Sequence, residues 1–363
     1  MEKTSKIYIA GHCGLVGSAI HKNLLSKGYT NFVLKSHKEC DLTSQGEVAA
    51  FFETEKPEYV FLAAAKVGGI IANSTYRGQF IYENLMIQNN IIHQAFKHNV
   101  KKLLFLGSSC IYPRDCAQPM SEDELLTNIL EYTNEPYAIA KIAGIKMCES
   151  YNLQYGTNFI SVMPTNLYGP NDNYDLEKSH VLPALIRKMH LGKCLETHNW
   201  KAIDADLQAR SVEGITNKNS EIEKRAILSK YGITGNTEII INLWGTGKPR
   251  REFLYSEDMA DACVHIMENK EFADVKPQDT KEIRNTHINI GTGKDLTISQ
   301  LADMVKEIVG FNGTILWDST KPDGTFQKLL NVDKLHSLGW KEKVSMLDGI
   351  RSVYDEYKKE GCF

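Results

Sequence analysis

A mixed α/β fold built on a doubly wound parallel sheet is predicted by two features of the first half of the chain. Short apolar runs alternate there with segments of helical period, the pattern that repeated βαβ units produce. Three glycines, Gly11, Gly14 and Gly17, follow the first apolar run and precede the first helix, as in a turn that receives dinucleotide phosphates. We therefore expect a Rossmann-type sheet with a smaller α/β substrate domain at the carboxyl side.

The elements of the cofactor half follow from this periodicity. Gly28 and Gly156 mark two helix ends, because a helix end favours a residue that tolerates positive φ. The expected strands are Lys6–Ala10, Asn31–Lys35, Tyr59–Ala63, Lys102–Leu106 and Asn158–Met163, and the expected helices lie near 15–27, 44–54, 80–98 and 136–155.

After Pro164 the alternation becomes irregular. A helix from Val181 to about His190 is expected to end at Gly192, and a long polar stretch follows it. Within that stretch Ser220 and Glu223 have the spacing of a capping box, which predicts the start of a short helix that ends at Gly232. The later expected elements are a strand at Glu238–Trp244, a helix near 256–268, a strand at His287–Gly291, and helices at Thr297–Val309 and Met346–Lys359.

Two domains are expected from this order. The Rossmann domain would contain residues 1–170, with returns near 238–268 and 285–292. The substrate domain would contain residues 171–237 and 293–363, including an inserted segment near 193–238.

The overall composition excludes several classes of partner. A net charge of -3 gives no reason to expect nucleic acid or an anionic membrane. The longest apolar run, Val60–Ile71, is interrupted by Lys66 and falls short of the ~20 residues of a membrane helix, and nothing like a signal peptide precedes Lys6.

The eight cysteines, at 13, 40, 110, 116, 148, 194, 263 and 362, are scattered without a C-x-x-C pair. Reduced thiols in a cytoplasmic protein are expected.

The end of the second expected strand bears on which dinucleotide binds. An NAD enzyme places a carboxylate there for the ribose hydroxyls, whereas an NADP enzyme needs positive charge for the 2′-phosphate. This chain has Lys35 and His37 at that point and no acid before Glu39. We therefore expect NADP(H), with Asp41 under the adenine.

Tyr137 and Lys141 are four residues apart at the start of an expected helix, so they share one face of it. Reduction of a ketone requires a proton at the oxygen as hydride reaches the carbon. A phenol can donate that proton when an ammonium stabilises the phenolate that forms. The alternative is a surface tyrosine and lysine paired by chance. The preceding glycine turn favours a catalytic pair.

Polar residues follow the fourth expected strand, where the ligands of parallel sheets bind. The hydroxyl of Ser108 could hydrogen-bond the substrate oxygen alongside Tyr137, and Ser109 remains an alternative. Cys110 is either an ordinary buried cysteine or a functional thiol, and the residues alone leave both readings open.

Several further motifs make the chain resemble one family, the GDP-L-fucose synthases of the extended short-chain dehydrogenase/reductases. The similarity covers nearly the whole chain. It includes residues 11–20, 63–70, 107–113, 134–144, 163–170, 179–181, 244–247, 251–254 and 321–325.

The resemblance implies an activity and a set of residues. The family epimerises C3 and C5 of GDP-4-keto-6-deoxy-mannose and then reduces its C4 ketone with NADPH. On this chain Tyr137, Lys141 and Ser108 match the reductase residues, and Cys110 and His180 match the base and acid of epimerisation. The implied cofactor contacts, beyond the glycines and Lys141, are Leu15, Val16, Ala64, Pro164, Asn166, Leu167 and His180.

The resemblance also implies contacts to the GDP-sugar. They are Ser108, Ser109, Asn166, Lys188, Trp244, Arg251 and Asp323. Lys188 and Arg251 suit the two charged phosphates of a GDP-sugar, whereas for Trp244 a core strand residue is the alternative. A homodimer through the helices near 80–98 and 136–155 is implied as well.

Two features depart from the family. Cys13 stands where the family usually has a basic residue, which removes one expected phosphate contact. A segment within Lys193–Glu238 has no counterpart, and it is either a solvated excursion or a cap over the sugar pocket. The alternatives to the family's reaction are therefore a C4 reductase for another GDP-4-keto sugar, such as a heptose derivative, and a non-catalytic dinucleotide-sensing protein.

Overall fold

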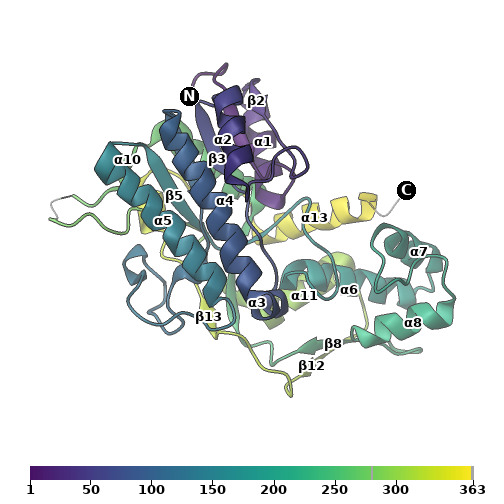
Figure 1. Ribbon diagram of the computed structural model, residues 1–363. Coiled ribbons are helices and arrows are strands. Elements are labelled where there is room, and N and C mark those ends of the chain that lie inside the picture. The colour runs from purple at the N-terminus through teal and green to yellow at the C-terminus, as the bar shows by residue number, and fades with distance from the viewer. Residues whose placement is uncertain (279–280, 361–363) are drawn as a thin grey trace. The chain divides into compact units, whose positions relative to one another are not determined.

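The computed structural model describes residues 1–278 and 281–360, and the chain divides into two compact units (Figure 1). The first unit contains Met1–Leu167, Glu252–Lys294 and Leu329–Lys343. The second contains Tyr168–Arg251, Asp295–Lys328 and the chain from Val344 onward.

A six-stranded parallel sheet forms the centre of the first unit. Its strand order is β2-β1-β3-β4-β5-β10, so the chain moves to one side of β1 and then crosses to the other, as in a doubly wound fold. The predicted fold class is confirmed. The strands are β1 (Ile7–Ala10), β2 (Phe32–Val33), β3 (Tyr59–Leu62), β4 (Lys102–Leu106), β5 (Phe159–Pro164) and β10 (Ile288–Ile290).

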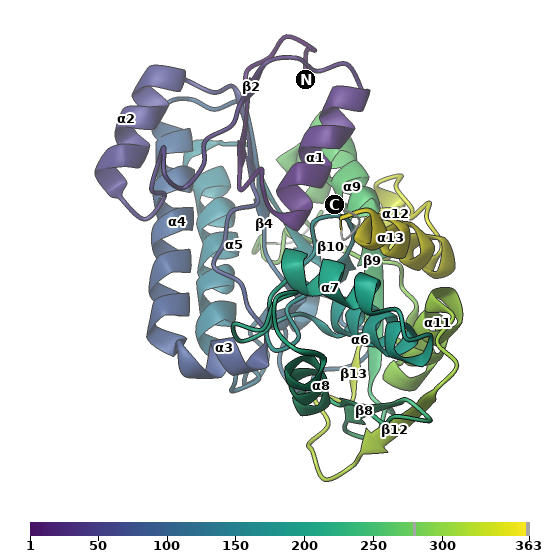
Figure 2. The same ribbon diagram turned by 90° about the vertical axis from the view of Figure 1, so that its right-hand side faces the viewer.

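Side chains on this sheet alternate between two buried hydrophobic clusters. In β1, Tyr8 and Ala10 belong to one cluster, whereas Ile7 and Ile9 belong to the other. Helices cover both clusters: Figure 2 shows α2, α4 and α5 on one side of the sheet and α1 and α9 on the other. Their bounds are α1 (Leu15–Ser26), α2 (Gln45–Glu55), α4 (Arg77–Lys97), α5 (Glu135–Tyr155) and α9 (Ser256–Asn269).

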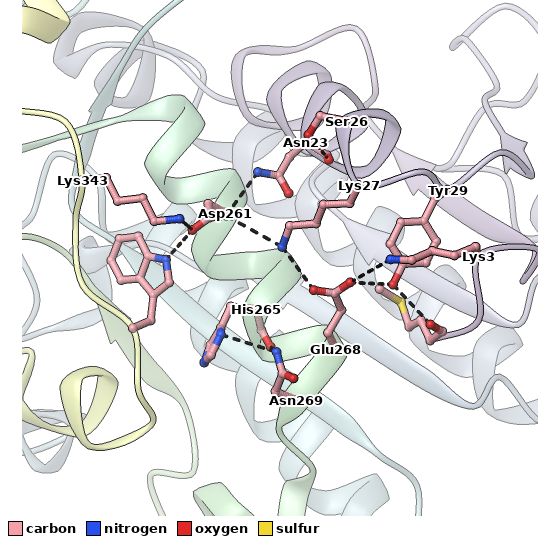
Figure 3. A network of polar contacts seen from close by, with 12 residues as sticks. Lys3, Asn23, Ser26, Lys27, Tyr29, Asp261, His265, Glu268, Asn269 and Lys343 are labelled. Carbon is pink, nitrogen blue, oxygen red and sulfur yellow. Dashed lines mark hydrogen bonds and ion pairs between the residues drawn. The ribbon is translucent and has the colours of Figure 1, made fainter.

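A polar network joins α1 to α9 and to the segment that ends the first unit (Figure 3). Nζ of Lys27 lies 3.1 Å from Oε2 of Glu268 and 3.8 Å from Oδ1 of Asp261. Oδ2 of Asp261 accepts hydrogen bonds from Nε1 of Trp340, at 2.9 Å, and from Nζ of Lys343, at 2.6 Å. These contacts therefore fix the carboxyl end of α1, whereas the amino end of the helix follows directly from the glycine turn.

Short elements complete the first unit. They are α3 (Ile70–Thr75), η1 (Ser109–Ile111), η2 (Glu122–Glu124), α10 (Phe272–Val275) and α12 (Asp333–Ser337).

The remaining strands form two small sheets, and five of the described helices belong to the second unit. One sheet, within the second unit, has the order β12-β8-β7. The other has the order β11-β9-β13 with β6 paired to β9, and the boundary between the two units falls within β6 and within β9. The strands are β6 (Asn166–Tyr168), β7 (Ile233–Thr234), β8 (Ile240–Trp244), β9 (Arg250–Tyr255), β11 (Asp295–Thr297), β12 (Thr314–Asp318) and β13 (Gln327–Lys328). The helices are α6 (Val181–Glu196), α7 (Trp200–Ala209), α8 (Glu221–Lys230), α11 (Ile298–Val309) and α13 (Met346–Glu360).

The expected end of α6 at Gly192 was wrong. The helix continues to Glu196, with Gly192 in its interior. A Cβ at Gly192 would lie 3.0 Å from a ring carbon of Phe311. The glycine therefore marks close packing between segments and not a helix end.

Two other expectations differ from the structure. The strand expected at Glu238–Trp244 was assigned to a return of the Rossmann domain, but β8 pairs in parallel with β12 in the second unit. Residues 329–343, expected in the substrate domain, belong to the first unit, where Leu330 forms a bridge to Met120. Both differences arise from pairings between segments far apart in the sequence.

The polar stretch after α6 contains more structure than the sequence predicted. The capping box is confirmed, since the backbone N–H of Ser220 donates to Oε2 of Glu223, at 2.8 Å, and that of Glu223 donates to Oγ of Ser220, at 3.3 Å. Helix α7 was missed, although Asn199 caps its start by accepting from the N–H of Ala202 at 3.1 Å.

No helix in the described residues is long and apolar enough to cross a membrane. The seven cysteines in this part of the chain are present as thiols rather than disulfides. Cys362 lies outside the described residues.

Candidate active site

The glycine turn between β1 and α1 leaves room for a ligand to approach the backbone. Gly11 has a φ of +84°, and a Cβ there would lie 2.8 Å from the backbone nitrogen of Ala64. A Cβ at Gly17 would lie 2.1 Å from the carbonyl oxygen of Gly11. Only glycine fits these two positions.

Helix α1 begins directly after this turn. Gly14 is its N-cap, and Leu15 and Val16 are its first residues. Glycine has no side chain to cap the first N–H groups, so these groups and the helix dipole are available to an anion. The turn fits the pyrophosphate of a dinucleotide.

The segment after β2 holds its acidic side chains in local hydrogen bonds. The carboxylate of Glu39 accepts from the N–H of Ser36, at 2.8 Å, and from its hydroxyl, at 2.6 Å, which lowers the pKa of Glu39. Oδ1 of Asp41 accepts from the N–H and hydroxyl of Thr43.

Basic side chains occupy the same segment. Lys35 lies 3.6 Å from Glu55, and His37 is exposed. The His37 ring lies 3.8 Å from Asp41, so both basic side chains lie beside carboxylates. The hydrogen bonds to Glu39 and Asp41 come from neutral groups and leave these carboxylates charged. Cys13, in the glycine turn, is exposed.

Tyr137 and Lys141 lie on the first two turns of α5, which begins at Glu135. The ammonium of Lys141 is only 3% exposed and donates a 2.8 Å hydrogen bond to the carbonyl of Leu106 at the end of β4. It lies 5.7 Å from the centroid of the Tyr137 ring, which packs edge-on against Phe80. The predicted pair therefore lies together, beside the carboxyl end of β4.

The surroundings shift the pKa of both groups. Burial lowers the pKa of Lys141 to about 8, and a thiolate at Cys110 would act in the opposite direction. Burial raises the pKa of Tyr137, a Cys110 thiolate would raise it further, and a hydrogen bond with Ser108 lowers it. The phenol is therefore protonated at neutral pH, as a proton donor must be. The bond to Tyr137 favours Ser108 over Ser109 as the substrate-facing hydroxyl.

The loop after β4 is held by contacts that the sequence did not predict. Ser108 caps η1, and its Oγ accepts from the N–H of Cys110 at 3.4 Å. Two residues on, the hydroxyl of Tyr112 donates to Oδ1 of Asn289, at 2.5 Å, and lies 3.1 Å from Nε2 of His287. Cys110 itself is 8% exposed. The loop is thereby anchored to β10 and to the segment before it.

The remaining expected cofactor contacts lie at the ends of sheet strands. Ala64 follows β3 and packs against the core, and Pro164 ends β5. Nδ2 of Asn166 donates to the carbonyl of Glu252 at 2.8 Å, and Leu167 packs against the second hydrophobic cluster.

Helix α6 of the second unit and its N-cap carry one expected catalytic residue, His180, and one expected substrate-binding residue, Lys188. His180 is its N-cap residue and is exposed. Lys188 lies two turns further on and is half-buried. Burial lowers the pKa of Lys188 to about 8. An anion next to this ammonium would offset the cost of its burial.

The last three expected residues lie around the turn after β8. Trp244 is 68% exposed, so the alternative of a core strand residue is wrong. The carboxylate of Asp323 accepts from the N–H and hydroxyl of Thr246, at 2.9 Å and 2.6 Å. Nη1 of Arg251 donates to the carbonyl of Arg250 at 2.7 Å.

Sequence reasoning missed one neighbour of this cluster. Nζ of Lys321 lies 5.6 Å from the centroid of the Trp244 ring. An exposed aromatic ring beside a cation is a surface on which a planar ligand can stack.

Comparison with known proteins agrees with this geometry. Residues 7–210 and 217–291 match the NAD dependent epimerase/dehydratase family. GDP-L-fucose synthase 1 of Arabidopsis thaliana is 50% identical over 361 residues, which cover 99% of this chain and 95% of that protein. Two solved structures from Campylobacter jejuni are also similar, and each match covers 99% of this chain and 99% of the other chain. One is a GDP-6-OMe-4-keto-L-xylo-heptose reductase, with a TM-score of 0.91 and 48% sequence identity. The other is a GDP-mannoheptose C4 reductase with NADP bound, with a TM-score of 0.85 and 47% sequence identity.

The fold and the site thus define a dinucleotide-dependent enzyme of the extended short-chain dehydrogenase/reductase type. The chain belongs to the NAD dependent epimerase/dehydratase family, and within it to the group that includes the GDP-L-fucose synthases. The resemblance drawn from the sequence motifs is confirmed.

Proposed function

We propose that this protein reduces the C4 ketone of a GDP-4-keto sugar with NADPH and also epimerises C3 and C5, as in the synthesis of GDP-L-fucose from GDP-4-keto-6-deoxy-D-mannose. The observation that carries the proposal is the buried Lys141 ammonium, which is bonded to Leu106 and lies beside the protonated phenol of Tyr137. Identity of 50% to a GDP-L-fucose synthase over 99% of the chain supports the substrate class.

In the reductive step, bound NADPH supplies the hydride to C4. Tyr137 donates its phenolic proton to the ketone oxygen, and Ser108 holds that oxygen by a hydrogen bond. Lys141 stabilises the phenolate that remains, and it holds the cofactor ribose. The proton lost by Tyr137 is regained from solvent before the next turnover.

In the epimerisation steps, the C4 ketone acidifies the hydrogens on C3 and C5. Cys110 removes such a proton, and His180 returns one to the opposite face of the carbon, which inverts it. A thiol has a reference pKa of about 8.5 and an imidazole one of about 6.5. Desolvation lowers the pKa of His180 in this protein, so its protonated form is a stronger proton donor than a free imidazolium. These two roles come from the resemblance to the family.

The choice of NADP(H) over NAD(H) is supported by charge at the end of β2. Lys35 and His37 are the basic side chains of this segment, and a 2′-phosphate would take the place of Glu55 and Asp41 as their partner. The related C4 reductase with NADP bound agrees with this choice.

The second unit supplies the groups proposed to hold the GDP-sugar. Lys188 and Arg251 bind the diphosphate, because two charged phosphates need cationic partners. Trp244 offers its exposed ring to a planar group of the substrate, and Asp323 accepts hydroxyl or base donors.

A second candidate is a C4 reductase for another GDP-4-keto sugar with little or no epimerisation. The structural match to a heptose reductase, with a TM-score of 0.91 and 48% identity, favours it. Cys110 and His180 are present in the chain under either candidate, so they do not separate the two.

We further propose a cytoplasmic homodimer. Seven thiols and the absence of a membrane-spanning helix in the described residues are compatible with the cytoplasm. Helices α4 and α5 expose apolar side chains that a second copy would cover, namely Tyr82, Ile139, Leu153 and Tyr155. Sedimentation equilibrium should give the mass of two chains, and the mass of one chain at micromolar concentration would contradict the dimer.

The substrate is tested by following NADPH consumption in D₂O with GDP-4-keto-6-deoxy-D-mannose and with a GDP-4-keto-heptose. We expect consumption of NADPH with the deoxyhexose and deuterium at its C3 and C5. The variant Cys110→Ser should lose the deuterium and retain reduction of an already epimerised ketone. Normal consumption without deuterium would leave only the second candidate, and no consumption with either sugar would contradict both. NADH serves as the cofactor control.

The binding of GDP should weaken at alkaline pH because of Lys188. Its pKa is about 8 in the free protein, and a bound phosphate raises it, so binding takes up a proton above pH 8. The Kd of GDP, measured by calorimetry, should then rise about fivefold between pH 8 and 9. Lys188→Arg keeps its charge in this range and should show a flat Kd. A flat profile for the unmodified protein would show that Lys188 does not bind the phosphates.

A further inference from the structure

A buried arginine lies at the point where four segments of the second unit meet. Arg187, in the middle of α6, is only 1% exposed. Its Nε and Nη2 donate to Oδ2 of Asp206, at 3.1 Å and 2.8 Å. Its Nη1 donates to the carbonyl of Tyr174 at 3.0 Å, and Nη2 also donates to the carbonyl of Arg210. Each nitrogen of the guanidinium therefore has a partner outside α6.

The carboxylate that compensates this charge comes from the inserted segment. Asp206 lies on α7 and is 3% exposed. Its Oδ1 accepts from the hydroxyl of Tyr357 on α13 and lies 3.8 Å from Nη1 of Arg210. A buried guanidinium that loses its carboxylate is left with uncompensated charge, so the surrounding segments must move.

Aromatic contacts close the same cluster. The rings of Tyr174 and Tyr357 lie 4.7 Å apart, and the guanidinium of Arg210 lies 4.5 Å from the centroid of the Tyr357 ring. We call Arg187, Asp206, Arg210, Tyr174 and Tyr357 the arginine cluster.

The arginine cluster is next to both groups that the proposed function places on the substrate. Arg187 immediately precedes Lys188, and neighbouring side chains on a helix point about 100° apart. Fixing the guanidinium inward therefore fixes the rotation of α6 and the direction of Lys188. Tyr174 lies in the segment that leads to His180, so the bond from Arg187 to its carbonyl also restrains the approach to the start of α6.

We propose that Arg187 and Asp206 are positioning residues that orient Lys188 and His180 toward the GDP-sugar, and that the inserted helix α7 is thereby part of the substrate-binding machinery. This inference depends on the proposed function, because the proposed function is what assigns Lys188 and His180 to the substrate. Of the two readings of the segment within 193–238, it excludes the purely solvated excursion.

The test compares two aspartates on the same helix. Asp206→Asn keeps the shape of the side chain and removes the charge that faces Arg187. Asp204→Asn is the matched control on the same helix, because the Asp204 side chain is 40% exposed and its partner Lys224 also donates to the carbonyl of Asn217, at 2.8 Å. The probes are GDP for binding, GDP-4-keto-6-deoxy-D-mannose for turnover, and NADPH for the binding site of the first unit.

For Asp206→Asn we expect the Kd of GDP and the KM of the sugar nucleotide to rise roughly ten- to a hundredfold, the penalty typical of a misplaced binding group. Deuterium entry at C3 and C5 should fall, while the Kd of NADPH stays within about twofold of the unmodified protein. Asp204→Asn should leave all three quantities within about twofold. A loss of melting temperature in Asp206→Asn with an unchanged Kd of GDP would overturn the inference, because it would show a purely structural role.

Tyr357→Phe provides a second variant if Asp206→Asn does not fold. It removes one hydrogen bond to Asp206 and keeps both charges, so the Kd of GDP should rise in the same direction by about threefold or more. An unchanged Kd in folded Tyr357→Phe would contradict the inference when Asp206→Asn cannot be measured. If the unmodified protein binds no GDP, the proposed function itself fails. If it binds GDP and the variants bind equally well, only the positioning role fails.

Discussion

The hydrogen bond from Lys141 to the carbonyl of Leu106 joins α5, which carries the proposed proton donor, to β4, which leads to the loop proposed to face the substrate. It is a buried, charge-assisted bond of 2.8 Å between α5 and the end of β4. The same ammonium lies 4.9 Å from the centroid of the Phe105 ring, a second contact that fixes the position of the charge. Together with the bonds from Tyr112 to Asn289 and His287, this contact fixes the loop of Ser108 and Cys110 relative to Tyr137.

The same burial sets the chemistry of the site. A desolvated lysine with a pKa of about 8 and a phenol whose pKa is raised are two groups with shifted proton affinities, which is the usual condition of an acid–base centre. A thiolate at Cys110 would raise the pKa of both groups, and this contribution would end once the thiolate had taken a proton from the sugar. Burial, the largest cause of the raised pKa of Tyr137, would still keep the phenol protonated for the reduction that follows.

Sequence reasoning succeeded where the signal is local. The glycine turn, the Tyr137–Lys141 spacing and the Ser220–Glu223 capping box each depend on residues within a few positions of one another, and the structure contains all three. The doubly wound sheet was predicted from short apolar runs that alternate with segments of helical period, because each βα unit is short enough for this alternation to be recognised in the sequence.

What the sequence could not predict depends on pairings between distant segments. Gly192 looked like a helix end because its partner, Phe311, is more than a hundred residues away. The pairing of β8 with β12 and the Arg187–Asp206 contact have the same character. An arginine within an apolar helix gives no sign of the carboxylate that will compensate it.

The most direct test of the account is the kcat of Tyr137→Phe. This change removes one hydroxyl from a ring that packs against Phe80, so the near-ultraviolet circular dichroism and the Kd of NADPH should match those of the unmodified protein. Loss of the proton donor should lower kcat for ketone reduction by about 10²- to 10⁴-fold. A folded Tyr137→Phe variant with a kcat close to that of the unmodified protein would contradict the assignment of Tyr137 as the proton donor.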